Sequence, residues 1–113
     1  MATLFDQIIN REIPAEIVFE DDQVLAFNDI NPQAPTHVLV IPKKPIATLN
    51  DITEDDLELV GRLHLTAARI ARERGIAEEG YRLVMNCNEY GGQTVFHIHL
   101  HLMGGRRFTW PAG

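Results

Sequence analysis

Three histidines, His97, His99 and His101, occupy every second position near the C-terminal end of the chain. On an extended strand, successive side chains point to opposite faces, so these imidazoles share one face while Ile98 and Leu100 point to the other. Histidine changes charge near neutral pH, and its free base can ligate a metal ion or attack an electrophile such as phosphorus. The spacing therefore predicts a sheet face with either a metal site or a nucleophile.

Two simpler interpretations of this histidine row (His97, His99 and His101) stay open. The row can be the solvated face of a half-buried strand, although strands have no special demand for histidine. It can also bind zinc, but at about 3.3 Å rise per residue the Cα atoms of His97 and His101 lie about 13 Å apart. One ion would more naturally use two of the three together with His37. No acidic residue adjoins the row in sequence to orient metal-bound rings.

A phosphoryl group fits the row better than one ion, because its reacting oxygens and leaving group are spread over several ångströms. His99 has an imidazole on each side, and we predict that it attacks as the neutral base to form a phosphohistidine-type intermediate. A neighbouring ring, His97 or His101, can hold the required tautomer or donate to a phosphoryl oxygen. The preceding residues Gly91–Thr94 offer backbone amides and the Gln93 and Thr94 side chains as donors.

The composition restricts the class of protein. A chain of 113 residues, 45% of them hydrophobic, predicts one domain spanning residues 1–113. A net charge of -6 argues against binding long nucleic acid but leaves room for a small anion in a local pocket. The chain has no apolar run of membrane-spanning length and no signal-peptide pattern, and Cys87 is its only cysteine. We therefore expect a soluble cytoplasmic protein.

The remaining patterns predict the elements that position the histidine row. Residues 4–9 have the spacing of a short amphipathic helix that packs as a lid, residues 16–28 form a hairpin, and residues 37–42 form a buried strand. Two further strands are expected, over residues 81–86 and from about Thr94 to Met103, with a polar loop at residues 87–93 between them. Five strands, two helices and hairpin-length connections predict an α+β protein with a five-stranded antiparallel sheet.

The longer helix is predicted to begin at Thr53, which precedes an acidic first turn, and to end at Gly75. Its predicted apolar face contains residues spaced by three and four, with His64 on or near it as a structural residue: Leu57, Val60, His64, Ala67, Ala68 and Ala71.

Residues 91–106, GGQTVFHIHLHLMGGR, resemble the histidine-triad superfamily, in its branch of histidine-triad nucleotide-binding proteins. The resemblance covers nearly the whole chain, because it extends to residues 13–15, 19–22, 26–27, 29–30, 32–37, 40–44 and the Trp110–Pro111 pair. It implies a homodimer with one continuous ten-stranded sheet and a purine nucleoside monophosphate at each of two sites. It also implies hydrolysis of nucleoside phosphoramidates, with AMP-type substrates, through a nucleotidyl-histidine intermediate and without a metal or other cofactor.

On matching positions, the resemblance implies that His99 is the nucleophile and His101 a phosphate contact. His97 and His37 then support the proton and tautomer network, and Thr94 contributes its hydroxyl where many relatives have serine. The implied nucleotide contacts are Asp29 for the ribose, four apolar residues around the base and four residues around the phosphate and leaving group: Ile30, Phe5, Ile8, Phe27, Asn86, Gly92, Gln93 and Thr94.

Two other functions remain open. A sister branch of the superfamily hydrolyses dinucleoside polyphosphates, although the Trp110–Pro111 tail favours the first branch. A nucleotide-binding regulatory or adaptor module is also possible, because a working site does not show how a cell uses it.

Overall fold

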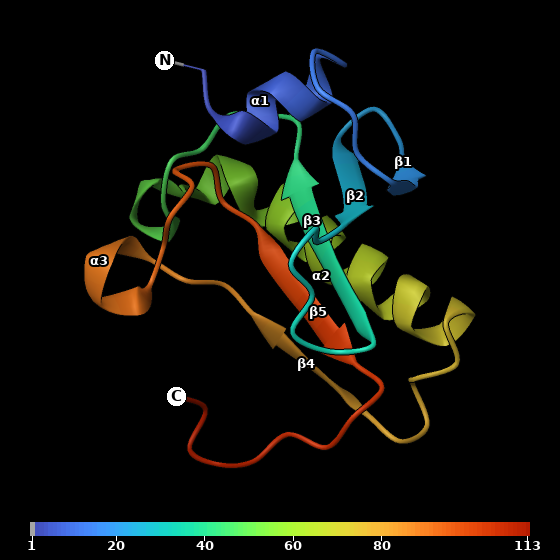
Figure 1. Cartoon of the computed structure of the whole chain (residues 1–113). Helices are drawn as coiled ribbons and strands as arrows, with labels where there is room; N and C mark the ends of the chain where they lie inside the picture. The colour runs from blue at the N-terminus through green and yellow to red at the C-terminus, as the bar shows by residue number, and fades with distance from the viewer. Residues whose placement is uncertain (1) are drawn as a thin grey trace.

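A five-stranded antiparallel sheet forms the centre of the computed structural model, which describes residues 2–113 (Figure 1). The strands follow one another across the sheet in the order β1 (Ile17–Glu20), β2 (Val24–Asn28), β3 (Thr36–Pro42), β5 (Leu100–Gly104) and β4 (Tyr81–Val84). All four neighbouring pairs are antiparallel. The predicted α+β class and sheet are confirmed, and β1 and β4 are the edge strands.

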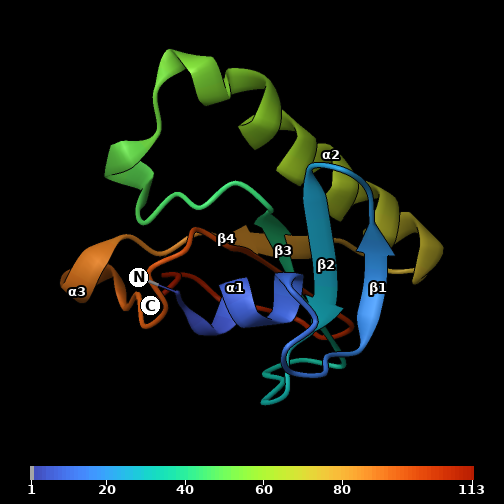
Figure 2. The ribbon, with the colours of Figure 1, turned by 90° about the horizontal axis from the view of Figure 1, so that it is seen from above.

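Helices cover the two faces of the sheet. The long helix α2 (Leu57–Glu73) lies on one face and the short helix α1 (Leu4–Ile9) on the other (Figure 2). Because both faces are covered, successive residues of β2 enter different cores. Val24 and Ala26 pack in the core under α2, whereas Leu25 and Phe27 pack in the core with α1. No helix within residues 2–113 is long and apolar enough to span a bilayer.

Helix α2 differs from its prediction in its start and in its buried face. A single 3-10 turn, η2 (Glu54–Asp56), precedes α2, so the helix begins at Leu57 rather than at Thr53. The end is as predicted, because Gly75 follows the C-cap with φ +72°. The buried residues of the helix are Leu63, Thr66, Ala67, Ile70 and Ala71.

The predicted face of α2 was wrong at Leu57, which is 72% exposed, and at His64, which is exposed. The chain carries two helical stripes of large apolar residues, one through Leu57 and Leu65 and one through Leu63 and Ile70. Periodicity alone does not say which stripe meets the sheet. The ring of His64 stays outside the core and contacts the backbone oxygen of Val60 through Nδ1 at 2.9 Å.

Both strands predicted near the C-terminus are shorter than expected. Strand β4 ends at Val84 rather than residue 86, and β5 begins only at Leu100 rather than at Thr94. The preceding segment leaves the ladder because the Ile98 N–H donates to the Ile46 oxygen (2.8 Å) of the loop after β3. The expected polar loop at residues 87–93 contains one helical turn, α3 (Asn88–Gly91), which closes at Gly92 with φ +85°. Another short turn, η1 (Leu49–Asp51), lies between β3 and η2.

Candidate active site

The histidine row lies on the α1 face of the sheet. Ile98 and Leu100 belong to the opposite core under α2, so the predicted alternation is confirmed even though His97 and His99 precede the β5 ladder. Phe5 of α1 presents its ring edge-on to His99, with 4.9 Å between ring centres. His97 and His99 are 1% and 6% exposed.

Helix α1 can hold Phe5 there because a capping box between Thr3 and Asp6 fixes its first turn. The Thr3 N–H donates to Asp6 Oδ2 (2.8 Å), and the Asp6 N–H donates to Thr3 Oγ1 (3.3 Å). This reciprocal arrangement satisfies two amides that a helix start leaves unpaired. The short helix therefore packs as a fixed cover over His99.

The ring of His99 is held with its Nε2 unprotonated. His99 Nδ1 lies 2.8 Å from the backbone oxygen of His97, and a carbonyl oxygen can only accept, so Nδ1 carries the proton. Nε2 then keeps its lone pair. The sequence-based prediction gave this task to a neighbouring imidazole, whereas the structure gives it to a backbone carbonyl. Burial lowers the pKa of His99, so its ring is neutral at pH 7.

His101 has the opposite arrangement, because a chain of hydrogen bonds fixes its other nitrogen. The Gln33 backbone N–H donates to His37 Nδ1 (3.0 Å), which leaves the His37 proton on Nε2. His37 Nε2 then donates to His101 Nδ1 (2.9 Å), so the proton of a neutral His101 is on Nε2. Burial, together with the neighbouring His99 and His37, lowers the pKa of His101 to about 4.

His99 and His101 thus form a complementary pair. Their ring centres are 5.0 Å apart, and one ring keeps a lone pair on Nε2 while the other keeps a proton on Nε2. Burial also lowers the pKa of His37, so the relay is neutral at pH 7. A nucleophile beside a hydrogen-bond donor is the arrangement needed to displace a leaving group from phosphorus.

His97 supports the site without facing it. Its Nε2 donates to the backbone oxygen of Pro42 at 2.7 Å, and its Nδ1 lies 3.6 Å from Asp6 Oδ1 of α1. Its side chain therefore joins the end of β3 to the helix that covers the row. Its own carbonyl holds the tautomer of His99.

The loop before the histidine row is arranged differently from the prediction at Gln93. The Gln93 side chain is buried and donates both amide protons to backbone oxygens, of Ala47 (2.7 Å) and Val95 (3.1 Å). Its Oε1 accepts from the Asn88 N–H (2.8 Å). Gln93 thus has no amide proton left for a phosphoryl oxygen, and it holds the loop in shape instead.

The other residues expected around the phosphate remain available. Thr94 and Gly92 are exposed, and Asn86 is half-buried beyond the end of β4. Because Gly92 has φ +85°, the chain can turn there without the strain that a side chain would introduce. The buried Gln93 between Gly92 and Thr94 anchors the segment on which both stand.

Asp29 lies at the junction of β2 and the histidine relay. Its Oδ1 accepts from the Asn31 N–H (2.8 Å), which is the turn-forming contact, while its Oδ2 lies 3.5 Å from His37 Nε2. The Asp29 N–H donates to the His37 oxygen (2.9 Å), so the start of β3 fixes its position. Asp29 therefore combines the turn role and proximity to the site, which sequence alone could not separate.

The apolar residues expected around the base fall into two groups. Phe5, Ile8 and Phe27 are buried in the α1 core, where the rings of Phe5 and Phe27 meet edge-on with centres 5.6 Å apart. Ile30 is 96% exposed in the loop after Asp29. The structure brings Phe5 to His99 and leaves Ile30 as an open apolar surface beside Asp29.

Asp29, His37 and His101 also form a candidate metal-ligand set, with one ligand atom of each within 4.8 Å of the others. However, the two ring nitrogens that face each other are 2.9 Å apart and share a proton. A tetrahedral zinc ion with bonds of 2.0 to 2.1 Å would separate two ligand nitrogens by about 3.3 Å. Metal binding at these atoms would therefore require breaking the relay that orients His101.

Comparisons with known proteins identify the family of this chain. The family model of the HIT domain matches residues 10–108. A purine nucleoside phosphoramidase of Escherichia coli strain K12 is 57% identical over 104 residues, which cover 92% of this chain and 87% of that protein. Among solved structures, a HIT family hydrolase from Legionella pneumophila Philadelphia 1 superposes with a TM-score of 0.97 at 57% identity, covering 99% of this chain and 100% of that chain. A HIT family hydrolase from Clostridium thermocellum gives a TM-score of 0.92 at 48% identity, covering 95% and 93%. A family model that matches residues 10–108, together with 57% identity over most of the length of both chains, shows that the chain belongs to the HIT domain family.

Proposed function

We propose that this protein is a hydrolase of purine nucleoside phosphoramidates, with AMP-type substrates, and that it acts through a covalent nucleotidyl group on His99. The observation that carries the proposal is the pair of opposite tautomers on His99 and His101. It is supported by the strong identity to the Escherichia coli relative, which is named a purine nucleoside phosphoramidase.

The first step forms one bond to phosphorus and breaks another. The lone pair of His99 Nε2 attacks the phosphorus, and the P–N bond breaks with its electron pair going to the departing nitrogen. His101 Nε2–H donates a hydrogen bond to that nitrogen as its negative charge develops, and solvent supplies the proton that completes the amine. The phosphorus is then bound to His99 Nε2.

The second step returns the enzyme to its resting state. A water oxygen bonds to phosphorus, the electron pair of the P–Nε2 bond returns to His99, and the proton released by the water goes to solvent. The products are the nucleoside monophosphate and the free enzyme. The two displacements together consume one water molecule, because the proton that solvent gave in the first step returns in the second.

The nucleotide site that we propose extends from the histidine pair towards Asp29. The Asp29 carboxylate accepts from the ribose hydroxyls, and the exposed Ile30 covers the base. Phe5, Ile8 and Phe27 form the wall behind it as part of the α1 core. The phosphate is surrounded by the following residues that precede or belong to the histidine row: Asn86, Gly92, Thr94, His99 and His101.

The decisive test is the His99→Ala variant. We expect turnover of an adenosine phosphoramidate to fall by about 10³-fold or more, while AMP binding measured by calorimetry is largely kept. His64→Ala is the matched control, because it removes an exposed imidazole of α2. Intact-mass analysis of the quenched wild-type reaction should find one added nucleotidyl group, and peptide mapping should place it on His99. Wild-type turnover by His99→Ala would overturn the nucleophile assignment, and faster turnover of a dinucleoside polyphosphate would overturn the substrate class.

We also infer a homodimer whose two sheets join along β4 into ten strands. The edge strand β1 is interrupted by a register shift between Ile17 and Phe19, which hinders pairing, whereas β4 pairs regularly with β5 and leaves its other side open. Helix α2 also presents an uncovered apolar stripe, with Leu57 and Leu65 at 72% and 49% exposure. A second copy along β4 would satisfy the open strand.

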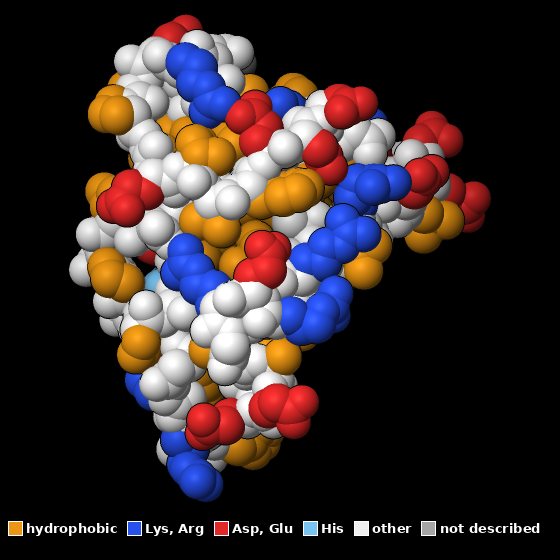
Figure 3. Space-filling model, turned by 90° about the vertical axis from the view of Figure 1, so that its right-hand side faces the viewer, with side chains coloured by type: hydrophobic (Ala, Val, Ile, Leu, Met, Phe, Trp, Pro, Cys, Tyr) orange, Lys and Arg blue, Asp and Glu red, His pale blue; other side chains and the backbone are white. Residues whose placement is uncertain are grey.

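The surface charge and the free thiol of Cys87 support our inferences about ligands and cellular location. On the face shown in Figure 3, basic and acidic side chains are interspersed rather than gathered into one basic surface. With a net charge of -6, such a surface supports small nucleotides rather than long nucleic acid as ligands. The single cysteine, Cys87, is free, which is consistent with the reducing cytoplasm.

A further inference from the structure

We propose that Arg106 is a positioning residue for the reaction, because its side chain fixes Gln33, and Gln33 in turn sets the tautomers of His37 and His101. The inference rests on the proposed function and deepens it by extending the site beyond the residues near the substrate. Arg106 touches neither the phosphorus nor the leaving group. It acts through the hydrogen bonds that keep a proton on His101 Nε2.

The bonds form one continuous path. Arg106 Nε donates to the Gln33 backbone oxygen at 3.0 Å. The Gln33 N–H donates to His37 Nδ1 at 3.0 Å, and His37 Nε2 donates to His101 Nδ1 at 2.9 Å. The Gln33 N–H determines which nitrogen of His37 carries the proton, and His37 in turn determines which nitrogen of His101 does, while Arg106 holds the Gln33 backbone that starts this sequence.

The Arg106 contact is needed to fix Gln33, because Gln33 is exposed and its side chain bonds only to a residue of its own loop. Its Nε2 donates to the Asn31 oxygen (3.1 Å), and the Asn31 N–H donates to Asp29 Oδ1 (2.8 Å). These bonds move together with the loop that they stabilise. Arg106 instead follows β5 by two residues, so it ties the loop to the strand that carries His101.

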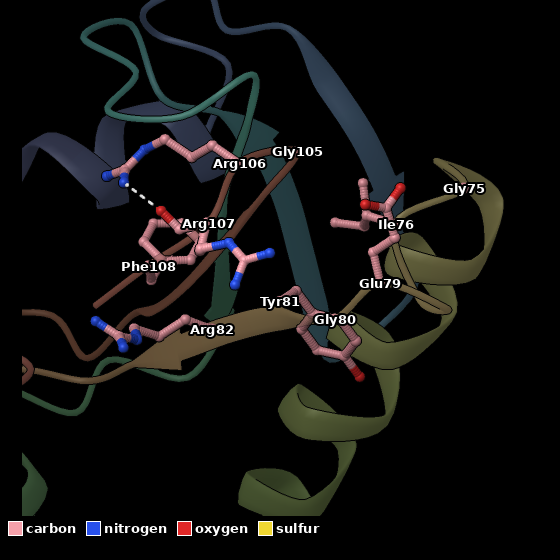
Figure 4. A pocket seen from close by; sticks show the side chains of 10 residues that line it. All are labelled: Gly75, Ile76, Glu79, Gly80, Tyr81, Arg82, Gly105, Arg106, Arg107 and Phe108. Carbon is pink, nitrogen blue, oxygen red and sulfur yellow. Dashed lines mark hydrogen bonds between the residues drawn. The ribbon is translucent and has the colours of Figure 1, made fainter. Parts of the chain in front are cut away.

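Arg106 is itself held in place. Its guanidinium stacks over the Phe108 ring at 4.2 Å from the ring centre, and its Nη1 donates to the Arg107 oxygen at 3.2 Å, the dashed line in Figure 4. The chain reaches this position through Gly105, where φ is +89° and an added Cβ would meet Pro35 Cβ at 2.9 Å. Arg106 thus lines one side of a cavity of about 480 Å³ while its Nε reaches the loop.

An arginine suits these simultaneous contacts better than a lysine. A planar guanidinium offers several N–H groups in a fixed fork and can stack on an aromatic face. A lysine ammonium could reach the Gln33 oxygen but would not keep the stacked, two-point geometry. Arg106→Lys is therefore an informative variant that keeps the charge and loses the fixed position.

The consequence for catalysis follows from the tautomers. If the Gln33 N–H moves away, His37 can place its proton on Nδ1, and its Nε2 then becomes an acceptor. A neutral His101 would then carry its proton on Nδ1, because Nδ1 has to donate to His37 Nε2. Its Nε2 would have no proton to donate. The donor for the leaving nitrogen is lost, although His99 still has its free lone pair.

The loss should depend on the leaving group. An alkylamine needs strong stabilisation of its developing charge, whereas an aromatic amine needs little. We expect Arg106→Ala to lower kcat by about tenfold for an alkylamine phosphoramidate of AMP and by less than about threefold for an arylamine phosphoramidate, with KM nearly unchanged. Arg106→Lys should show the same pattern with a smaller loss.

The matched control is Arg107→Ala, which removes the neighbouring arginine of the same cavity and has no part in the path. It should retain wild-type rates on both substrates. Nitrogen-15 NMR of labelled imidazoles supplies a readout independent of turnover. In the wild type, His37 and His101 should both show protonated Nε2 and unprotonated Nδ1, and in Arg106→Ala these signals should move towards a mixture of tautomers.

Two results would overturn the proposal: unchanged His37 and His101 nitrogen signals in Arg106→Ala, or equal losses on both substrates. If Arg106→Ala fails to fold, Arg106→Lys decides by the same two readouts. If the wild type hydrolyses neither substrate, the proposed function fails, and the NMR comparison still tests the link between Arg106 and the two rings.

Discussion

Replacing His101 with glutamine should make the protein's stability less sensitive to mild acid. The pKa of His101 is lowered to about 4 in the folded protein by burial and by its two neighbouring imidazoles. In the unfolded chain, histidine titrates at about 6.5. Between these two values the unfolded chain binds more protons than the folded protein, so stability falls as the pH falls. The contribution of His101 is therefore complete above about pH 6.5 and is lost down to about pH 4.

The size of the effect follows from the two pKa values. For titration at about 4 folded and about 6.5 unfolded, linkage gives a loss of about 2 kcal/mol between pH 7 and pH 5 from His101 alone. His99 and His37 act in the same direction, because burial lowers the pKa of each. Between pH 7 and pH 5, the free energy of unfolding of the wild type should therefore fall by more than the contribution of His101 alone. That of His101→Gln should fall by about 2 kcal/mol less than that of the wild type.

Urea unfolding at pH 7 and pH 5, followed by far-UV circular dichroism at one fixed protein concentration, measures this difference. The comparison uses the change between the two pH values within each variant, so a constant cost of the substitution cancels. His64→Gln controls for the loss of one histidine as such, because its ring is exposed on α2. Equal losses in the wild type and His101→Gln would refute the assignment of a half-buried, neutral His101 in the folded state.

Two further predictions concern assembly and metal. Leu57→Glu should leave the protomer folded and shift sedimentation from dimer to monomer if this exposed side chain lies in the inferred dimer contact; an unchanged dimer would remove α2 from that contact. Exhaustive dialysis against a chelator should leave phosphoramidate turnover within about twofold, because the histidine pair needs no Lewis acid to supply its nucleophile. A loss restored by added zinc would instead favour the Asp29, His37 and His101 ligand set.

The sheet and the two longer helices were largely predictable because each has a strong local signal, whereas the short turn α3 was expected to be a loop. Alternation around Ile98 and Leu100 predicts which face carries the histidine row, and the glycine after the long helix predicts its end. The buried face of α2 was not predictable, because Leu57 with Leu65 and Leu63 with Ile70 form competing stripes on one helix. The packing of the sheet selects the second pair.

The candidate site also contains residues that the sequence could identify and one residue whose role only the structure shows. The row itself and the loop at Gly92 and Thr94 could be selected from residue types and their spacing, whereas Asp29 was selected only by the family resemblance. The role of Gln93 could not be predicted correctly, because its side-chain amide donates to backbone oxygens that are 46 and two residues away in the sequence. No local pattern reports such partners.

The sequence by itself determined that three imidazoles share one face of a sheet and that their chemistry suits phosphorus better than a single ion. Only the tertiary structure decided which nitrogen of each ring carries a proton. That decision depends on the backbone N–H of Gln33 and the backbone oxygens of Pro42 and His97, groups that nearly all residue types possess and that sequence therefore does not distinguish. Folding brings them to the rings, and their fixed donor or acceptor character leaves a lone pair on His99 Nε2 and a proton on His101 Nε2, the arrangement behind the nucleophile and donor roles that we propose.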